Sequence, residues 1–123
     1  MLSIHGLIRA QDLELGRDAD TGGQTKYVVD LARALASHPK VDRVDLVTRL
    51  IRDPEVDADY RKAEESLAEG ARIIRIECGP DEYIPKEQLW DHLDSFTDNL
   101  MLWLQGQAVM PAVVHSHYAD AGY

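Results

Sequence analysis

Apolar residues recur at helical spacing in two stretches of the chain. The first predicted helix begins near Gln24 and is closed by Pro39, with apolar residues at i, i+3, i+4 and i+7: Val28, Leu31, Ala32 and Leu35. The second begins around Pro85, a residue suited to a first helical turn, and carries apolar residues at spacings of four and three: Leu89, Leu93, Phe96, Leu100 and Trp103. We expect each helix to bury one apolar face.

Short apolar segments around these helices predict four strands, at residues 2–6, 44–47, 71–77 and 112–117. The adjacent apolar pairs Ile73-Ile74 and Val113-Val114 are typical of parallel strands that are covered on both faces. Residues 52–70 are charged and poorly periodic, and "YRKAEESLAEG" within them favours a helical turn or two. This alternation predicts an α/β fold with an open, doubly wound, mainly parallel sheet.

Two polar stretches, residues 17–24 and 115–120, each follow the end of a predicted strand. In open α/β sheets, ligands bind beyond the carboxyl ends of the strands. We therefore expect these two stretches to meet at one rim of the sheet.

Gly22 and Gly23 stand directly before the first predicted helix. A helix N-terminus has unpaired N–H groups and a partial positive charge, and glycine permits positive φ and a close approach of the backbone to a ligand. The pair therefore predicts a phosphate- or sugar-binding turn, while a simple strand-to-helix bend remains the alternative. The pattern matches neither the P-loop nor GxGxxG.

The second polar stretch, "HSHYADAG", places two histidines on the same side of a strand. His115 and His117 make a metal pair conceivable, but zinc sites need three or four ligands and no third is near, so no metal site is predicted. Tyr118 and Asp120 follow at a second expected helix start. Two cations in this acidic chain, Lys86 and Arg17, could serve a phosphate group.

Composition narrows the function classes further. The formal net charge of −9 over 123 residues argues against nucleic acid as the main partner. No apolar run reaches the ~20 residues that span a bilayer, and no signal peptide is evident. One cysteine, Cys78, excludes an internal disulfide and fits a reducing compartment, so we expect a cytoplasmic protein without a membrane partner. Both ends of the sequence look cut, so we expect the chain to be a fragment of a larger protein.

Four stretches together carry a family resemblance: "SIHGLIRAQDLELGRDADTGGQTKYVVDLARALA", "VDLVTRLI", "DEYIPKEQLW" and "HSHYADAGY". In this order they resemble the N-terminal domain of the sucrose-phosphate synthases, which are retaining glycosyltransferases of the GT-B type related to sucrose synthases. The resemblance runs from residue 2 to residue 123. It implies that residues 1–123 are part of an acceptor-side Rossmann-like domain, and that the donor-binding C-terminal domain is absent from this chain.

The resemblance also implies substrates and residue roles. Glucose would pass from UDP-glucose or ADP-glucose to fructose 6-phosphate, giving sucrose 6-phosphate with retained configuration. Gly22, Gly23 and Gln24 would face the cleft, Lys86 would contact the acceptor phosphate, and His117 would position the transferred sugar without acting as a general base. The nucleotide sugar is a co-substrate and no tightly bound cofactor is implied; Mg²⁺ is compatible but not indicated. The fragment alone is expected to be inactive.

Two other readings of the sequence stay open. One is a sucrose synthase or another GT-B transferase with a different acceptor, against which Lys86 and "RDADTGGQ" favour a phosphorylated acceptor. The other is a non-catalytic sugar-phosphate-binding module. The complete reading frame would separate these possibilities, because only an enzyme requires a second Rossmann-like domain.

Overall fold

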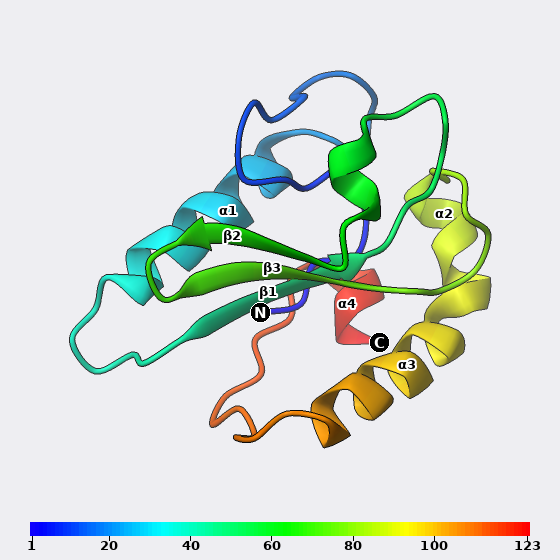
Figure 1. Cartoon of the computed structure of the whole chain (residues 1–123). Helices are drawn as coiled ribbons and strands as arrows, with labels where there is room; N and C mark the ends of the chain where they lie inside the picture. Colours follow the sequence, from blue (N-terminus) through cyan, green and yellow to red (C-terminus); the bar gives the residue numbers. More distant parts are fainter.

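A three-stranded mixed sheet forms the centre of the computed structural model, which describes residues 1–123 (Figure 1). The strand order is β1-β3-β2, where β1 (Val44–Arg49) pairs parallel with β3 (Ala71–Ile76). Strand β2 (Glu64–Ala68) joins β3 through a tight hairpin and pairs with it antiparallel. The α/β class is confirmed, but the sheet is mixed rather than mainly parallel.

Strand β2 lies where the sequence favoured helical turns. The only helical turn in that region is the 3₁₀ segment η1 (Ala58–Arg61), so the expectation for the residues after it is wrong. The β2 sequence "EESLA" holds residues with low strand propensity. Tertiary contacts hold it in the sheet: Leu67 enters the core, and Glu65 lies 2.6 Å from the fully buried guanidinium of Arg75.

Neighbouring residues of β1 and β3 point to opposite faces of the sheet, as the pleat requires. Leu46 and Ile73 pack against the buried face of α1 (Gly23–Ala36), whose fourteen residues match the first predicted helix. Val47 and Ile74 instead join a second core with residues from α2 (Lys86–Leu89) and α3 (Leu93–Gln105). Helices therefore cover both faces of the sheet (Figure 1).

The second predicted helix is interrupted. The chain from residue 86 to residue 105 runs through α2, the 3₁₀ turn η2 (Trp90–His92) and α3. The buried residues of this segment keep the predicted face: Leu89, Leu93 and Phe96. None of the helices combines the length and the apolar character that crossing a bilayer requires.

Two predicted strands do not form. Residues 2–6 contribute only Leu2, which makes isolated parallel bridges to Val47 and to Ser116. Residues 112–117 are otherwise irregular, and Val113 and Val114 are 77% and 62% exposed. The prediction of a buried strand there is wrong. The segment pairs with its neighbours through a single bridge, and its two valines are exposed instead of packing in a core. It leads into α4 (Tyr118–Gly122).

Candidate functional site

Loops and helix ends from four parts of the chain meet around the N-terminus of α1. They are the segment of residues 3–6, the loop 16–24, the segment 83–86 and the segment 115–120, linked by the contacts described below. Stretches 17–24 and 115–120 were expected at one rim, and both contact Lys86, the first through Asp20 and the second through Tyr118; His117 also lies against Tyr27 of α1, with ring centroids 5.9 Å apart. Lys86 joins them, since its ammonium lies 5.1 Å from the ring of Tyr118.

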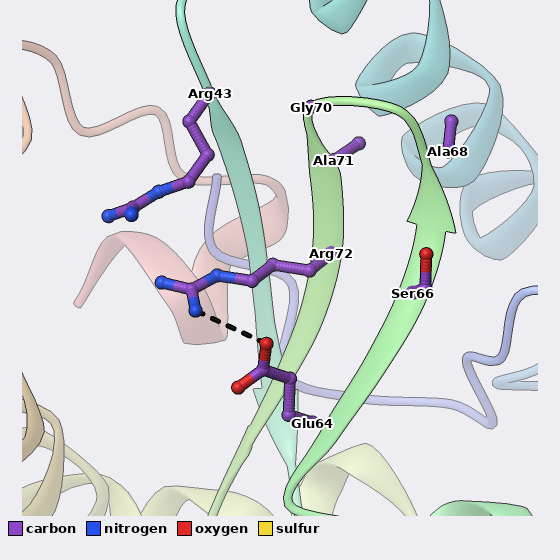
Figure 2. A pocket seen from close by; sticks show the side chains of 7 residues that line it. All are labelled: Arg43, Glu64, Ser66, Ala68, Gly70, Ala71 and Arg72. Atoms are coloured by element: carbon purple, nitrogen blue, oxygen red, sulfur yellow. Dashed lines mark hydrogen bonds and ion pairs between the residues drawn. The ribbon is translucent and has the colours of Figure 1, made fainter.

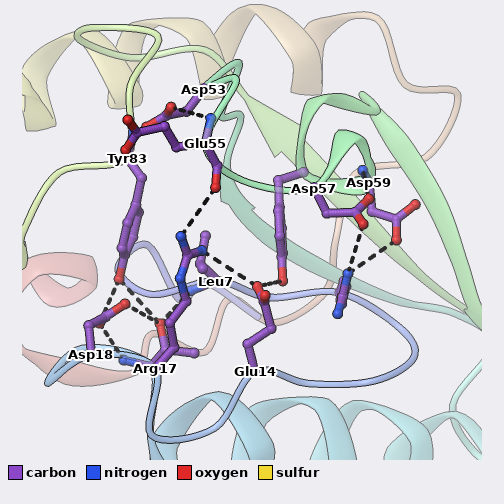
Figure 3. A network of polar contacts seen from close by, with 12 residues as sticks. Leu7, Glu14, Arg17, Asp18, Asp53, Glu55, Asp57, Asp59 and Tyr83 are labelled. Carbon is purple, nitrogen blue, oxygen red and sulfur yellow. Dashed lines mark hydrogen bonds and ion pairs between the residues drawn. The ribbon is translucent and has the colours of Figure 1, made fainter.

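The turn before the glycine pair is organised by Asp18 (Figure 3). Its Oδ1 accepts the backbone N–H groups of Asp20 at 2.8 Å and Thr21 at 3.0 Å, which is a local side-chain turn. The same oxygen accepts the hydroxyl of Tyr83 at 2.9 Å, and this hydroxyl is also 3.2 Å from Thr21 Oγ1. Burial raises the pKa of the Tyr83 phenol, as does the Asp18 carboxylate, so the hydroxyl stays protonated and donates.

Gly22 and Gly23 begin α1 in open space. Gly22 is the N-cap residue with φ −133°, and no side chain caps the helix. A β-carbon added at either glycine would meet no atom within 4 Å, and neither residue has a positive φ. The expectation of positive φ is therefore wrong, because the chain enters this helix through Gly22 at φ −133° and ψ −146°. Because no side chain caps α1, its first N–H groups are left for an anion or a sugar hydroxyl.

Gln24 lies in the first turn of α1. Its amide nitrogen is 3.5 Å from Ser3 Oγ, so the side chain leans toward the N-terminal segment of the chain. This contact is long and leaves the Gln24 amide free to exchange it for a ligand.

Lys86 is held by Asp20 at two points. Its backbone N–H donates to Asp20 Oδ2 at 2.7 Å, and its Nζ lies 3.5 Å from Oδ1. The pKa of Lys86 is raised, first by the Tyr118 side chain and then by Asp20, so the ammonium stays charged. A positive charge is thus fixed beside the α1 N-terminus, with Asp20 itself only 7% exposed.

His117 is buried, and its Nε2 has no hydrogen-bond partner. Its ring lies 4.3 Å from that of the exposed His115. Burial lowers the pKa of His117, and His115 and the N-terminal amino group lower it further, so the imidazole is neutral at neutral pH. A buried polar atom without a partner is costly, and a ligand hydroxyl would satisfy it. No cluster of three or more metal-ligating side chains exists.

Asp120 and Tyr118 are both tied to His5. Asp120 is 3% exposed and its Oδ2 lies 2.9 Å from His5 Nδ1, while the His5 ring meets the Tyr118 ring edge-on with centroids 4.7 Å apart. Tyr118 has φ +71°, a conformation that a bulky residue adopts only under tertiary constraint. Because the Asp120 carboxylate is occupied inside the protein, any part it takes in binding would run through His5.

Arg17 points toward acidic residues and the Glu55 backbone rather than into the Asp18 turn (Figure 3). It lies 3.7 Å from Glu14 and donates to the carbonyl oxygen of Glu55 at 3.4 Å. Glu14 in turn accepts the hydroxyl of Tyr60 at 2.6 Å. A role of Arg17 at a phosphate stays a prediction.

Three residues of this site were not singled out from the sequence: His5, Asp20 and Tyr83. Each is hydrogen-bonded to a partner between 62 and 115 positions away in the chain, and a single sequence does not reveal such long-range contacts. Asp20 stands inside the "RDADTGGQ" stretch, and its place two residues before the glycine pair was the one available indication.

Two surface pockets lie in different parts of the molecule. One, of about 360 Å³, is beside the site and is lined by Asp18, Ala19, Asp20, Tyr83, Pro85 and Glu87. The other, of about 290 Å³, lies over the β2–β3 hairpin, where Arg72 pairs with Glu64 at 3.2 Å (Figure 2). Only the first pocket borders residues that the sequence predicted to bind substrate.

Known proteins resemble the chain over nearly all of its length. It is 48% identical to the probable sucrose-phosphate synthase 4 of Oryza sativa subsp. japonica and 46% identical to sucrose-phosphate synthase 1 of Arabidopsis thaliana. Each match covers 99% of this chain and 14% of the relative, so the chain spans about one seventh of the length of these curated relatives. No family model matches the chain.

The fold gives an independent comparison. The solved structure of the sucrose-phosphate synthase from Thermosynechococcus elongatus matches with a TM-score of 0.58 and 25% identity, over 85% of this chain and 24% of that one. The family resemblance seen in the sequence is confirmed by both comparisons. Over nearly its whole length, therefore, the chain is homologous to one segment of the sucrose-phosphate synthases.

Proposed function

We propose that this chain forms the acceptor side of a retaining glycosyltransferase that moves glucose from a nucleotide sugar to fructose 6-phosphate and yields sucrose 6-phosphate. In this proposal the sheet and its helices are part of a Rossmann-like half of a GT-B fold. A second domain holds UDP-glucose or ADP-glucose. The homology to sucrose-phosphate synthases supports the reaction class.

The main support for the proposal is a set of polar groups around the α1 N-terminus that can still bind a ligand. The ammonium of Lys86, the uncapped start of α1 at Gly22-Gly23 and the orphaned Nε2 of His117 belong to segments joined through Tyr27 and Tyr118. A cation and free backbone N–H groups suit a phosphate, and a neutral imidazole suits a sugar hydroxyl. A phosphorylated sugar carries both chemistries.

Each residue has a defined part in the proposed reaction. Lys86 contacts the acceptor phosphate, and Gly22, Gly23 and Gln24 lie against the sugar and the donor diphosphate. His117 exchanges a hydrogen bond with the transferred glucosyl unit. The leaving diphosphate accepts the proton of the attacking hydroxyl on the same face, so no protein nucleophile is needed and the chain contributes positioning and charge stabilisation.

The neutral state of His117 agrees with a positioning role. Burial lowers the pKa of this histidine, so the imidazole does not carry a charge that would compete with Lys86 for the phosphate. A general base would need a hydroxyl proton within reach and a group to orient its ring. His117 Nε2 has no partner in the protein, and the contacts of its ring are aromatic, with Tyr27 and His115.

A product analysis tests the proposal. The complete open reading frame that encodes this chain is expressed and incubated with UDP-glucose or ADP-glucose and either fructose 6-phosphate or fructose. Formation of sucrose 6-phosphate from the phosphorylated acceptor supports the proposal. Sucrose from fructose alone would indicate a sucrose synthase, and hexose phosphate binding without any transfer would indicate a binding module.

A further inference from the structure

Two loops that carry predicted substrate-binding residues touch at Tyr83. The segment of residues 78–86 brings Lys86 to the site, and the loop 16–22 ends at Gly22, the first residue of the glycine pair. Tyr83 lies in the first of these segments, three residues before Lys86, and its hydroxyl reaches into the second. No role was assigned to it in the function proposed above.

The Tyr83 hydroxyl enters the centre of the turn that precedes α1. It donates to Asp18 Oδ1 at 2.9 Å, the same oxygen that accepts the backbone N–H groups of Asp20 and Thr21. It also lies 3.2 Å from Thr21 Oγ1, which in turn accepts the N–H of Leu7. The Tyr83 phenol thus adds a contact from 65 positions away to a turn that Asp18 otherwise closes through its neighbours Asp20 and Thr21.

A second contact, made by Asp20, joins the same two loops. The Asp20 carboxylate accepts the Lys86 backbone N–H at 2.7 Å and pairs with the Lys86 ammonium at 3.5 Å. The backbone direction of Asp20 is itself set by its N–H bond to Asp18. Tyr83, Asp18 and Asp20 thus form a closed chain of contacts that runs from one loop to the other and back.

The start of the 78–86 segment is anchored independently. The buried guanidinium of Arg49 donates to the carbonyl oxygens of Cys78, Pro80 and Glu82, and the Tyr83 N–H donates to Asp53 Oδ2 at 3.0 Å. The end of the segment packs Tyr83 and Ile84 against apolar clusters, and it makes its polar contacts with the loop 16–22 through the Tyr83 hydroxyl and through Lys86. The Tyr83 hydroxyl consequently affects where Lys86 stands more than whether the segment folds.

We propose that Tyr83 is a positioning residue for the acceptor site, whose hydroxyl fixes the distance between Lys86 and the Gly22-Gly23 turn. The inference rests on the proposed function for its substrate, a phosphorylated sugar. A phosphate held at Lys86 and a sugar held at the α1 N-terminus require that distance to be constant. Loss of the hydroxyl leaves both loops folded but free to move apart.

The chain supplies a matched control in Tyr60. Its hydroxyl donates to the carboxylate of Glu14 at 2.6 Å, so it too is a buried phenol that anchors the loop before the glycine pair. Its ring belongs to the apolar cluster against which Tyr83 packs, but its hydroxyl makes no hydrogen bond to the segment that carries Lys86. Tyr83→Phe and Tyr60→Phe each remove one hydroxyl and keep the ring.

Two measurements test the inference. Amide hydrogen exchange on the 123-residue chain reads the link directly: Tyr83→Phe should speed exchange at Thr21 and at Lys86, and Tyr60→Phe should leave both near wild type. In the transfer assay with the complete protein, Tyr83→Phe should raise KM for fructose 6-phosphate by about threefold to tenfold, the worth of one hydrogen bond. The value of kcat and KM for the nucleotide sugar should stay within about twofold.

The outcomes separate this inference from the function on which it rests. A wild-type protein that shows no transfer would overturn the proposed function, and hydrogen exchange would still decide whether the link exists. An active protein in which Tyr83→Phe and Tyr60→Phe behave alike, in exchange or in KM, would overturn the positioning role. A fall in kcat that follows the loss of thermal stability in both variants would also overturn it.

Discussion

Asp20 binds Lys86 with both carboxylate oxygens, one on the backbone N–H at 2.7 Å and the other 3.5 Å from the ammonium. The backbone contact places the residue, and the side-chain contact orients its charge. An incoming phosphate must therefore share the ammonium with a carboxylate that is already there. The acceptor preference of this site depends on how that competition is resolved.

Substitution of Lys86 tests the phosphate contact. In the complete protein, Lys86→Ala should raise KM for fructose 6-phosphate by at least about tenfold, because charge-assisted hydrogen bonds are the strongest polar contacts. The preference over fructose should shrink by the same factor. Lys62→Ala is the matched control, since Lys62 also pairs with an aspartate, Asp59 at 2.9 Å, outside the site. An unchanged preference in Lys86→Ala would refute the assignment.

Substitution of Asp20 probes the competition itself. Asp20→Asn keeps an oxygen for the Lys86 N–H but removes the charge that faces the ammonium. The ion pair is long, at 3.5 Å, and the Lys86 side chain is partly exposed, so the gain in acceptor affinity should be small, about twofold to threefold. Asp20→Ala should instead weaken binding, because it also removes the backbone contact. Acceptor KM values for the two variants that move in the same direction would contradict this division of roles.

Fold and site differ in how far the sequence predicts them. Helix α1 and strands β1 and β3 have strong periodic or continuous apolar patterns, and the structure confirms all three. Strand β2 was missed because its glutamates and serine have no strand signature, and a tertiary ion pair of Glu65 with Arg75 holds it. The Asp20–Lys86 contact spans 66 positions, so only folding reveals it.

The glycine pair separates close approach from backbone strain. Gly23→Ala should change the free energy of unfolding by no more than about 1 kcal/mol, since φ is not positive and the added β-carbon meets nothing. Transfer activity should still fall by a much larger factor, because the added β-carbon would hold the ligand away from the N–H groups of α1. A displacement of the reacting groups by about 1 Å can cost ~100-fold in rate. Melting curves and initial rates on the same preparations measure both.

Gly6 is the contrasting position. It has φ +84°, and a β-carbon there would lie 2.5 Å from the carbonyl oxygen of Asp20. Gly6→Ala should therefore destabilise the chain by at least about 2 kcal/mol and disturb the turn before α1.

For Gly23→Ala, an activity loss that only follows its loss of stability would mean that the glycine pair merely makes a bend.

His117 should give the chain a specific acid sensitivity. Burial lowers its pKa in the folded chain from the ordinary value of 6.5, so the unfolded chain takes up the proton first as the pH falls. The free energy of unfolding should therefore rise with pH between the lowered pKa and 6.5. Below this window the full loss of stability caused by His117 is present. Urea unfolding from about pH 8 to pH 5 should show a smaller loss in His117→Gln than in wild type. Equal losses would place the acid sensitivity elsewhere.

The same histidine should matter for turnover. His117→Ala should lower kcat by about tenfold to a hundredfold with little change in acceptor KM, because the side chain serves the transferred sugar. His117→Gln keeps a hydrogen-bonding group and should restore part of the rate. Activity near wild type in His117→Ala would make the residue structural only.

We expect a phosphorylated hexose to bind where Lys86, the α1 N-terminus and His117 meet. Titration of the 123-residue chain with fructose 6-phosphate, followed by the amide resonances of Gly22, Gly23 and Gln24 and the side-chain resonances of Lys86 and His117, tests it most directly. We predict saturable shifts at these residues with fructose 6-phosphate and only weak shifts with fructose. Shifts confined to the arginines of the β2–β3 hairpin pocket, or equal responses to fructose and fructose 6-phosphate, would contradict it.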